Sequence, residues 1–171
     1  MKKAPLVFLA VLVFSGFGSI TSAQSTDSKV YSLFLINIAK YSSWPEDKPE
    51  FHIAVMGNST VYDELQQYAE RGINGKKMKL SQAKSVEEVG DAHIVYLPYN
   101  SSSRLEDLIK ATEGKSIMIV TERPGLHKKG AGFSFFVNDK SHLRFDINMT
   151  DLDKRRIKVA KNLAGMAHEV I

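Results

Sequence analysis

The stretch FHIAVMGNSTVYDELQQYAERG, residues 51–72, decides the fold. It begins with a short apolar run rich in strand-forming residues, which Gly57 closes. Any of the polar residues 58–60 can cap a helix, and Thr60 with Asp63 matches a capping box. Apolar residues then recur at helical spacing to the end of the stretch. A strand, a turn and a helix in this order form a β-turn-α unit.

The alternation of strand and helix continues along the chain. Strands are expected at about 78–81, 93–97 and 116–121, where short apolar runs lie between polar segments. A short helical stretch at 85–89 and a helix at 104–112 separate them. Strands that alternate with helices favour parallel pairing with right-handed crossovers.

The segment 29–43, which precedes this alternation, is apolar almost all round. A helix of this kind needs partners on more than one side, either a sheet plus another helix or a second subunit. The dipeptide Trp44-Pro45 is expected to end it, because the residue before a proline is pushed out of helical conformation.

The last third of the chain changes character. The runs 132–137 and 142–147 alternate with period 2 and predict an antiparallel hairpin. One final helix is expected from Thr150 to about Val170, with its apolar residues on one side. The elements together predict an α/β fold, a three-layer sandwich with a mainly parallel sheet of about six strands and a C-terminal antiparallel hairpin.

The N-terminus has the three zones of an export signal. Lys2 and Lys3 come first, an apolar run follows at 6–14, and a stretch of small residues ends at Ala23, after which we expect cleavage. An uncleaved anchor helix is the alternative, but glycines and serines interrupt the apolar run well before the roughly 20 residues that a membrane span requires. The prediction is a periplasmic protein with one domain, residues 24–171.

The amino-acid composition excludes several kinds of functional site. The chain has no cysteine, which excludes disulfides, thiol chemistry and lipid attachment through cysteine. Two of its four net positive charges belong to Lys2 and Lys3, and the remaining basic residues alternate with acidic ones, so nucleic-acid binding is not expected. The five histidines show no metal-site spacing, and no Gly-x-Ser-x-Gly elbow occurs. The sequence therefore predicts no metal, no cofactor and no enzyme.

Two segments are candidates for ligand binding. At residues 58–60 the free backbone N–H groups of a helix start can bind a small anion, although plain capping is the simpler interpretation. The loop 122–130 follows a strand at the carboxyl edge, where open α/β sheets bind ligands, and Arg144 is expected on the same side. A solvated basic loop is the alternative. The loop carries three charges that can receive an anion or an acidic surface: Arg123, Lys128 and Lys129.

Four stretches, taken together and in order, resemble one protein family: 29–45, 53–57, 117–121 and 130–148. The most specific features are Trp44-Pro45 and the strand Arg-Phe-Asp-Ile-Asn at 144–148. The family is that of the periplasmic regulator YfiR, which includes HmsC-like proteins. The matched positions are Asn37, Lys40, Trp44, Pro45, Gly57, Gly130, Gly132, Arg144, Phe145 and Asn148.

The resemblance implies an α/β sandwich that works without catalysis. It would bind the extracytoplasmic part of a membrane signalling protein, often a diguanylate cyclase, and hold it inactive, and some members also bind small molecules. Better-known members carry disulfides, whereas this chain has no cysteine, which puts redox control out of reach.

The leading hypothesis is a periplasmic regulator that represses a diguanylate cyclase or sensor kinase by contact and is tuned by a small ligand. Its apolar first helix would bind the partner or form a homodimer. The alternatives are a binding protein for a small anionic metabolite and, less favoured, an exported enzyme of unassigned kind. The candidate residues for ligand or partner binding are Asn37, Lys40, Trp44, Asn58, Ser59, Thr60, Arg123, Lys128, Arg144 and Asn148.

Overall fold

The computed structural model describes residues 21–171, with side chains from Asp27 onward. The expected signal peptide and its cleavage site lie outside the part whose side chains are described. In the described part, no helix is both long enough and apolar enough to cross a membrane.

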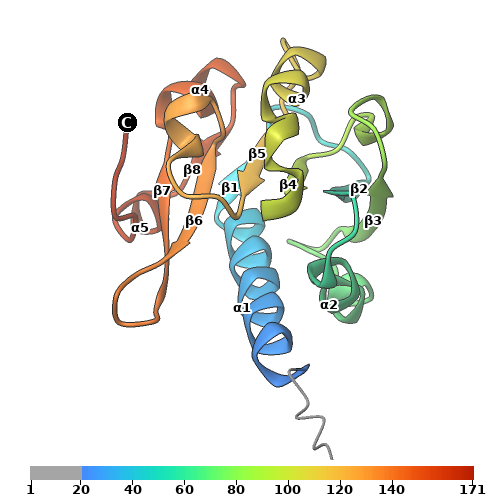
Figure 1. Cartoon of the computed structure of the whole chain (residues 1–171). Coiled ribbons are helices and arrows are strands. Elements are labelled where there is room, and N and C mark those ends of the chain that lie inside the picture. The colour runs from blue at the N-terminus through green and yellow to red at the C-terminus, as the bar shows by residue number, and fades with distance from the viewer. Residues whose placement is uncertain (1–20) are drawn as a thin grey trace, which may run out of the picture.

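The elements alternate along the chain much as the sequence predicts (Figure 1). The helices are α1 (Thr21–Lys40), α2 (Thr60–Ala69), α3 (Leu105–Ala111), α4 (Met149–Lys154) and α5 (Lys161–Ala164), with short 3-10 helices η1 (Glu87–Val89), η2 (Tyr99–Arg104) and η3 (Leu126–Lys129). The strands are β1 (Ser42–Ser43), β2 (Glu50–Met56), β3 (Lys77–Ala83), β4 (Ile94–Leu97), β5 (Met118–Thr121), β6 (Phe133–Val137), β7 (Leu143–Ile147) and β8 (Lys158–Val159).

The main sheet has six strands in the order β3-β2-β4-β5-β6-β7. Every neighbouring pair is parallel except β6 and β7, which form the predicted antiparallel hairpin. The strands β4 and β5 are buried throughout, which explains why they read as continuous apolar runs in the sequence. A second, two-stranded sheet joins β1 to β8.

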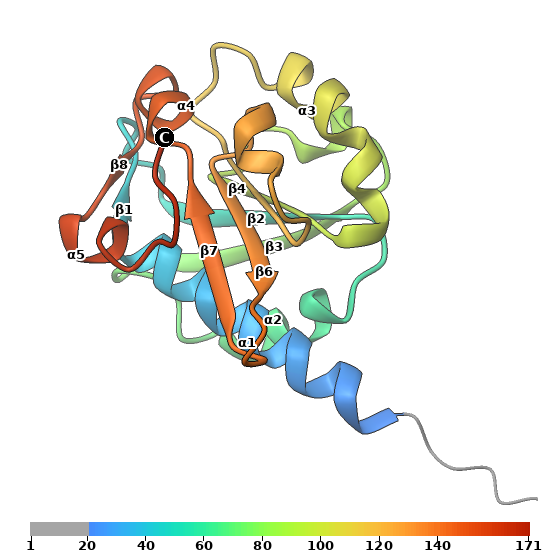
Figure 2. The ribbon, with the colours of Figure 1, turned by 60° about the vertical axis from the view of Figure 1, so that its left-hand side comes forward.

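Successive side chains of β2 enter two different cores. Ile53 and Val55 lie in the core that α1 and α2 cover, whereas Ala54 and Met56 lie in the core that α3 covers. Figure 2 shows α1 crossing the sheet at an angle, with its N-terminal end extending beyond it. Helices on both faces of the sheet confirm the predicted three-layer sandwich.

The turns around α2 differ slightly from the prediction. Ser59, one of the three predicted caps, is the N-cap, since its Oγ accepts a hydrogen bond from the backbone N–H of Val61 at 3.2 Å, so the capping box expected at Thr60 and Asp63 does not form. After the helix, Gly72 has a φ of +64°, and a Cβ at this position would lie 2.2 Å from the carbonyl oxygen of Lys76. Only glycine fits this turn without a shift of the backbone.

The first helix ends earlier than predicted. It stops at Lys40, not at the Trp44-Pro45 dipeptide, because Ser42 and Ser43 pair with β8. Its partners are the sheet, α2 and the C-terminal segment, which provides the covering on several sides that its apolar sequence requires.

The prediction of one long C-terminal helix is wrong, because the structure has α4, β8 and α5 in its place. Arg156 has a φ of +59° and stops α4. The backbone N–H of Ile157 then donates to the carbonyl of Leu152 at 2.9 Å, and that of Arg156 donates to the carbonyl of Asp153 at 2.9 Å. These two bonds form a Schellman motif with an arginine where glycine is usual. The chain continues into β8 and α5, and it ends beside β7 through a bridge from Val170 to Ile147.

His93, at the amino end of β4, makes folding stability depend on pH. Its Nδ1 accepts a hydrogen bond from the backbone N–H of His52 at 3.0 Å, and its ring stacks on Phe51 with centroids 4.5 Å apart. Burial, aided by the nearby charge of Lys48, lowers the pKa of His93 from 6.5 to about 4. The unfolded chain therefore binds more protons between these two pH values, and stability falls as the pH drops through this window.

We expect the free energy of unfolding, measured by urea denaturation, to decrease from about pH 6.5 to pH 4. His93→Asn retains an acceptor near the position of Nδ1 and removes the titrating group, so its pH dependence should be flatter than that of the wild type. The exposed His142 provides the control, because His142→Asn should leave the wild-type profile unchanged. Identical profiles for His93→Asn and the wild type would contradict this assignment.

Candidate functional site

A large pocket lies where the topology of the sheet reverses. The chain leaves β2 toward β3 on one side and returns to β4 on the other side, so the loops after β2 and β4 diverge. This is the switch point at which open α/β sheets bind ligands. The pocket has a volume of about 770 Å³ and is lined by Asp27, Ser28, Tyr31, Asn58, Ser59, Thr60, Val61, Tyr62, Asp63, Gln82, Pro98, Tyr99, Asn100 and Glu122.

The predicted residues 58–60 do line this pocket. The backbone N–H of Gly57 donates to the carbonyl of Ala83 at 2.7 Å, which fixes the turn that precedes them. Asn58 is held by a contact from Gln82 Nε2 to its Oδ1 at 3.3 Å, and Ser59 is engaged in capping α2. The helix start is therefore part of a larger cavity rather than an isolated anion site.

The charged side chains that line this pocket are acidic, whereas the sequence suggested an anion site at residues 58–60. Its lining includes the carboxylates Asp27, Asp63 and Glu122, and no lysine or arginine of the described residues lines it. Burial raises the pKa of Tyr31, and the charges of Glu122 and Asp27 raise it further. Carboxylates and tyrosine rings suit a neutral polar or positively charged ligand, so the lining disfavours an anionic ligand here.

Glu122 is the most firmly held of the three carboxylates. The phenolic O–H of Tyr96 donates to its Oε1, and the backbone N–H of Tyr99 donates to its Oε2 at 2.9 Å. Burial, followed by the charge of Glu122, raises the pKa of Tyr96 well above its ordinary value, so the phenol remains a donor. Glu122 follows β5 directly. It is the first residue of the loop 122–130, which the sequence placed at the carboxyl edge of the sheet as a candidate for ligand binding.

The basic loop does not gather its three charges at one point. Arg123 lies over the ring of Tyr99 at 5.8 Å and donates to Ser102 Oγ at 3.2 Å. Arg123 and Lys129 line a neighbouring cavity of about 590 Å³ beside α3. Lys128 points elsewhere, since its Nζ lies 2.9 Å from a carboxylate oxygen of Glu169.

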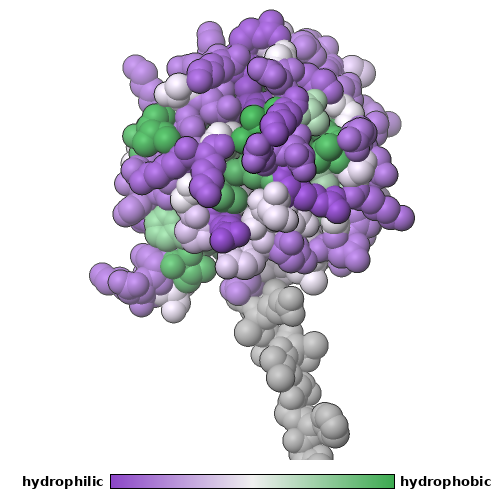
Figure 3. Space-filling view, turned by 45° about the horizontal axis from the view of Figure 1, so that its top comes forward, coloured by the Kyte–Doolittle hydropathy of each residue, from purple (hydrophilic) through white to green (hydrophobic). Residues whose placement is uncertain are grey.

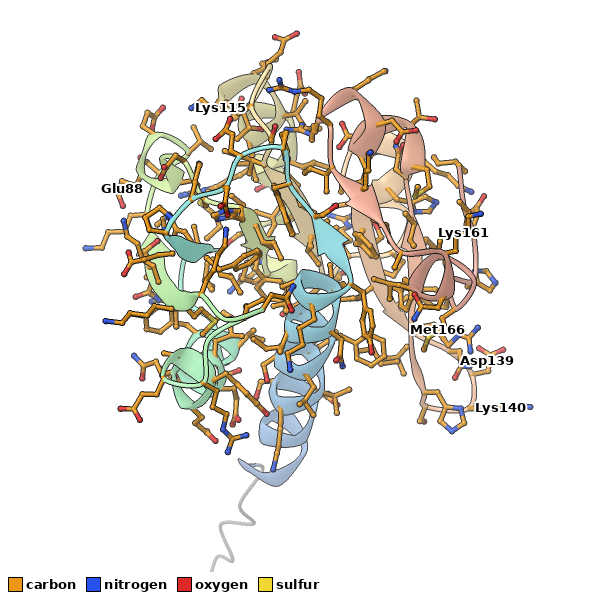
Figure 4. All side chains as sticks on the ribbon, turned by 180° about the vertical axis from the view of Figure 1, so that it is seen from behind. Glu88, Lys115, Asp139, Lys140, Lys161 and Met166 are labelled. Atoms are coloured by element: carbon orange, nitrogen blue, oxygen red, sulfur yellow. The ribbon has the colours of Figure 1, made fainter. Side chains whose placement is uncertain are left out.

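A third cavity, of about 370 Å³, lies between α1 and α5, and we call it the α1–α5 groove. It is lined by Phe34, Asn37, Ile38, Tyr41, Phe145, Asn162, Leu163 and Met166. Tyr41 is 48% exposed and Met166 is 61% exposed, so large apolar surface faces solvent at its rim. Figure 4 shows Met166 on the side of the molecule that carries the hairpin tip with Asp139 and Lys140. The predicted Asn37 lies in this groove, and Lys40 is exposed at the end of the same helix.

Two other predicted residues have structural roles. Trp44 is half-buried, and its indole N–H donates to the carbonyl of His93 at 3.2 Å. Asn148 is 8% exposed, caps α4 through the N–H of Asp151, and donates to the carbonyl of His127 at 2.7 Å. Arg144 is exposed on β7, opposite Phe136 in the hairpin.

A polar cluster beside β7 was not predicted from the sequence. It consists of His127, Asp146 and Glu169, which come from three distant segments of the chain. Metal sites are predicted from ligands at short, regular spacing, and these three residues are too far apart along the chain to show such a spacing. Only the docking of the C-terminal segment against β7 brings them together.

These features define a class of protein: an α/β fold with a mainly parallel sheet, helices on both faces and an open pocket at the switch point. A family model described as YfiR/HmsC-like matches residues 28–168, so the chain belongs to the YfiR/HmsC-like family. The match confirms the resemblance seen in the sequence. This family is one of periplasmic regulatory proteins.

Solved structures share the fold. A conserved domain protein from Vibrio cholerae O1 biovar eltor str. N16961 superposes with a TM-score of 0.61 at 13% identity, over 84% of this chain and 60% of that one. The ABC domain from Streptococcus pneumonia, solved in complex with L-Trp, gives a TM-score of 0.60 at 14% identity, over 80% of this chain and 59% of that one. The chain thus spans about 60% of each structure, and at these identities the likeness shows the fold alone. No curated protein sequence matches the chain.

Proposed function

We propose that the chain is a periplasmic regulator that binds and represses the extracytoplasmic part of a membrane diguanylate cyclase or sensor kinase, tuned by a small ligand. The observation that carries this proposal is the match to the YfiR/HmsC-like family from residue 28 to residue 168. The matched range contains all three segments that form the α1–α5 groove.

The α1–α5 groove is the surface that we assign to the partner. Its floor is formed by Phe34, Ile38 and Phe145, and Asn37 and Asn162 provide polar groups beside them. Exposed apolar surface rimmed by polar residues is typical of interaction sites. By contrast, the face shown in Figure 3 is mostly hydrophilic, and its hydrophobic residues form separate small groups. That face offers a protein partner no continuous apolar surface.

The helix α1 connects the groove to the switch-point pocket. Its residues Asp27 and Tyr31 line the pocket, and Phe34 and Ile38, further along the same helix, line the groove. A rigid helix that contacts both sites can couple them, since a ligand that shifts α1 alters the shape of the groove. Repression requires the chain to bind the inactive state of its partner more tightly than the active state, because equal affinity for both states shifts nothing.

The test is binding of the exported chain, purified from the periplasm, to the periplasmic fragment of a cyclase or kinase encoded beside it. We expect Met166→Glu to weaken binding at least about 30-fold, as loss of an interface hot spot does. The matched control is Val137→Glu, since Val137 is 54% exposed and lies outside the groove lining. Equal binding by both variants would exclude the groove as the partner surface.

The second candidate function is that of a binding protein for a small metabolite, and the switch-point pocket favours it. Because the lining is acidic, a cationic or neutral metabolite fits better than the anionic one predicted from the sequence. A thermal shift with a metabolite mixture, together with no binding to the periplasmic fragment of the cyclase or kinase, would favour this function over repression.

A further inference from the structure

The buried cluster beside β7 lies outside the switch-point pocket and the α1–α5 groove. Its residues are His127 on η3, Asp146 on β7 and Glu169 in the C-terminal segment, and their ligand atoms lie within 4.8 Å of one another. Asp146 follows Phe145 in β7, so it faces the side of the sheet away from the α1 core. The backbone N–H of Ile171 donates to the carbonyl of Ile147 at 3.0 Å, and this contact holds Glu169 near the cluster.

The position of His127 is fixed by its backbone. Its N–H donates to Ser134 Oγ at 2.6 Å, and its carbonyl accepts from Asn148 Nδ2 at 2.7 Å. The imidazole is 1% exposed. Its Nε2 lies 3.2 Å from Glu169 Oε2, whereas the buried Nδ1 has no hydrogen-bond partner. Asp146 Oδ2 lies 3.6 Å from Nδ1, which is too long for a hydrogen bond.

Asp146 has one oxygen paired and one oxygen directed at the histidine. Its side chain is 8% exposed, and its Oδ1 lies 3.0 Å from His168 Nδ1. Buried charges in proteins are paired or coordinate metals, because the loss of hydration is otherwise costly. Two ligand atoms that each lie about 2.0–2.2 Å from a shared Zn²⁺ can be separated by up to about 4 Å, so the 3.6 Å gap between Nδ1 and Oδ2 is wide enough for a shared cation.

We propose that His127, Asp146 and Glu169 form a binding site for a divalent transition-metal cation, with zinc as the best match. One imidazole and two carboxylates are a zinc ligand set, whereas calcium and magnesium take oxygen ligands alone. His168 holds Asp146 in place through the oxygen that does not face the metal, in the manner of outer-shell partners in metal sites.

Lys128 competes with the cation for Glu169. Its Nζ lies 2.9 Å from the same Oε2 that faces His127, and its side chain is 57% exposed. When a metal binds at Nδ1, the carboxylate of Glu169 leaves Lys128 and Nε2 and turns toward the ion, and the lysine turns toward solvent. The bound metal then ties together the loop 122–130, β7 and the C-terminal segment.

The experiment is calorimetric titration of the chelator-treated full exported chain with Zn²⁺, with Co²⁺ absorption as a second readout of the ligand geometry. We expect one Zn²⁺ per chain, and we expect Asp146→Asn and Glu169→Gln to weaken binding by about 100-fold or more, since even outer-shell changes cost about 10–100-fold. Lys128→Met should strengthen binding. The exposed His142 lies outside the cluster, so His142→Gln should bind as the wild type does.

Hydrogen exchange at the C-terminal segment provides an independent readout. The amides of His168 and Ile171 bond to β7 residues Phe145 and Ile147, so bound Zn²⁺ should slow their exchange in the wild type. The proposal is overturned if Zn²⁺ fails to bind stoichiometrically, or if Glu169→Gln binds it as tightly as the wild type. Glu169 is partly exposed, so this variant remains decisive if Asp146→Asn does not fold.

Discussion

Phe135→Ala should lower the free energy of unfolding by about 3–5 kcal/mol, the range for loss of a large buried aromatic side chain. Phe135 in β6 is fully buried. Its ring stacks on Tyr31 with centroids 5.6 Å apart and meets Phe34 edge-on at 5.8 Å. It therefore anchors α1 to the sheet, and its removal leaves a cavity that rigid neighbours fill only in part.

The measurement is denaturant unfolding, with the midpoint and slope compared between variants. Val137→Ala is the control, because Val137 lies in the same strand but is 54% exposed, and it should change stability by less than about 1 kcal/mol. Because Tyr31 also lines the switch-point pocket, Phe135→Ala should weaken ligand binding as well. A change in stability no larger than that of the control would contradict the anchoring role.

Arg155→Met should destabilise the fold by about 3 kcal/mol or more, because it removes one partner of a buried ion pair. The guanidinium of Arg155 is 7% exposed, and its Nε donates to Asp151 Oδ2 at 2.8 Å. Its Nη1 donates to the carbonyl and the hydroxyl of Thr112 at 3.2 and 3.1 Å. The arginine thus joins α4 to the end of α3, and its loss removes the donor to Asp151 Oδ2 and to Thr112 Oγ1, whereas the carbonyl of Thr112 still accepts from the backbone N–H of Lys115 at 3.1 Å.

Two further variants separate the charge effect from the packing effect. Asp151→Asn combined with Arg155→Met should recover part of the lost stability, because the uncompensated buried carboxylate is gone. The neighbouring exposed Arg156 is the matched control, since Arg156→Met removes the same charge without breaking a buried pair. If Arg156→Met were as destabilising as Arg155→Met, net charge rather than the buried pair would be responsible.

The zinc and repression proposals can fail separately, because they concern different parts of the molecule. The α1–α5 groove faces the α1 core side, and the His127 cluster lies on the other face of β7. If Zn²⁺ changes partner affinity in the wild type but not in Glu169→Gln, the cluster regulates the groove. If Zn²⁺ changes partner affinity neither in the wild type nor in Glu169→Gln, the metal acts only on the stability of the C-terminal segment.

The strands were predicted well from the sequence because strands buried on both faces of a sheet appear as continuous apolar runs. The runs at β4 and β5 and the second half of β2, residues 53–56, are almost entirely apolar, and the period-2 pattern of β6 and β7 marks the hairpin. The helix ends were predicted less well. The stop at Arg156 uses a positive-φ arginine without a glycine signal, and α1 ends early because Ser42 and Ser43 pair with a distant strand.

The sequence by itself determined the order of the elements, the class of the fold and the family, because apolar periodicity and local motifs are properties of neighbouring residues. Only the tertiary structure decided the chemistry of the sites. The acidic lining of the switch-point pocket and the His127 cluster each combine residues from distant segments, and strand order and chain crossing bring them together. The stretch 51–72 contains most of β2, which lies between β3 and β4 in the sheet, and the switch-point pocket forms where the chain leaves β2 toward β3.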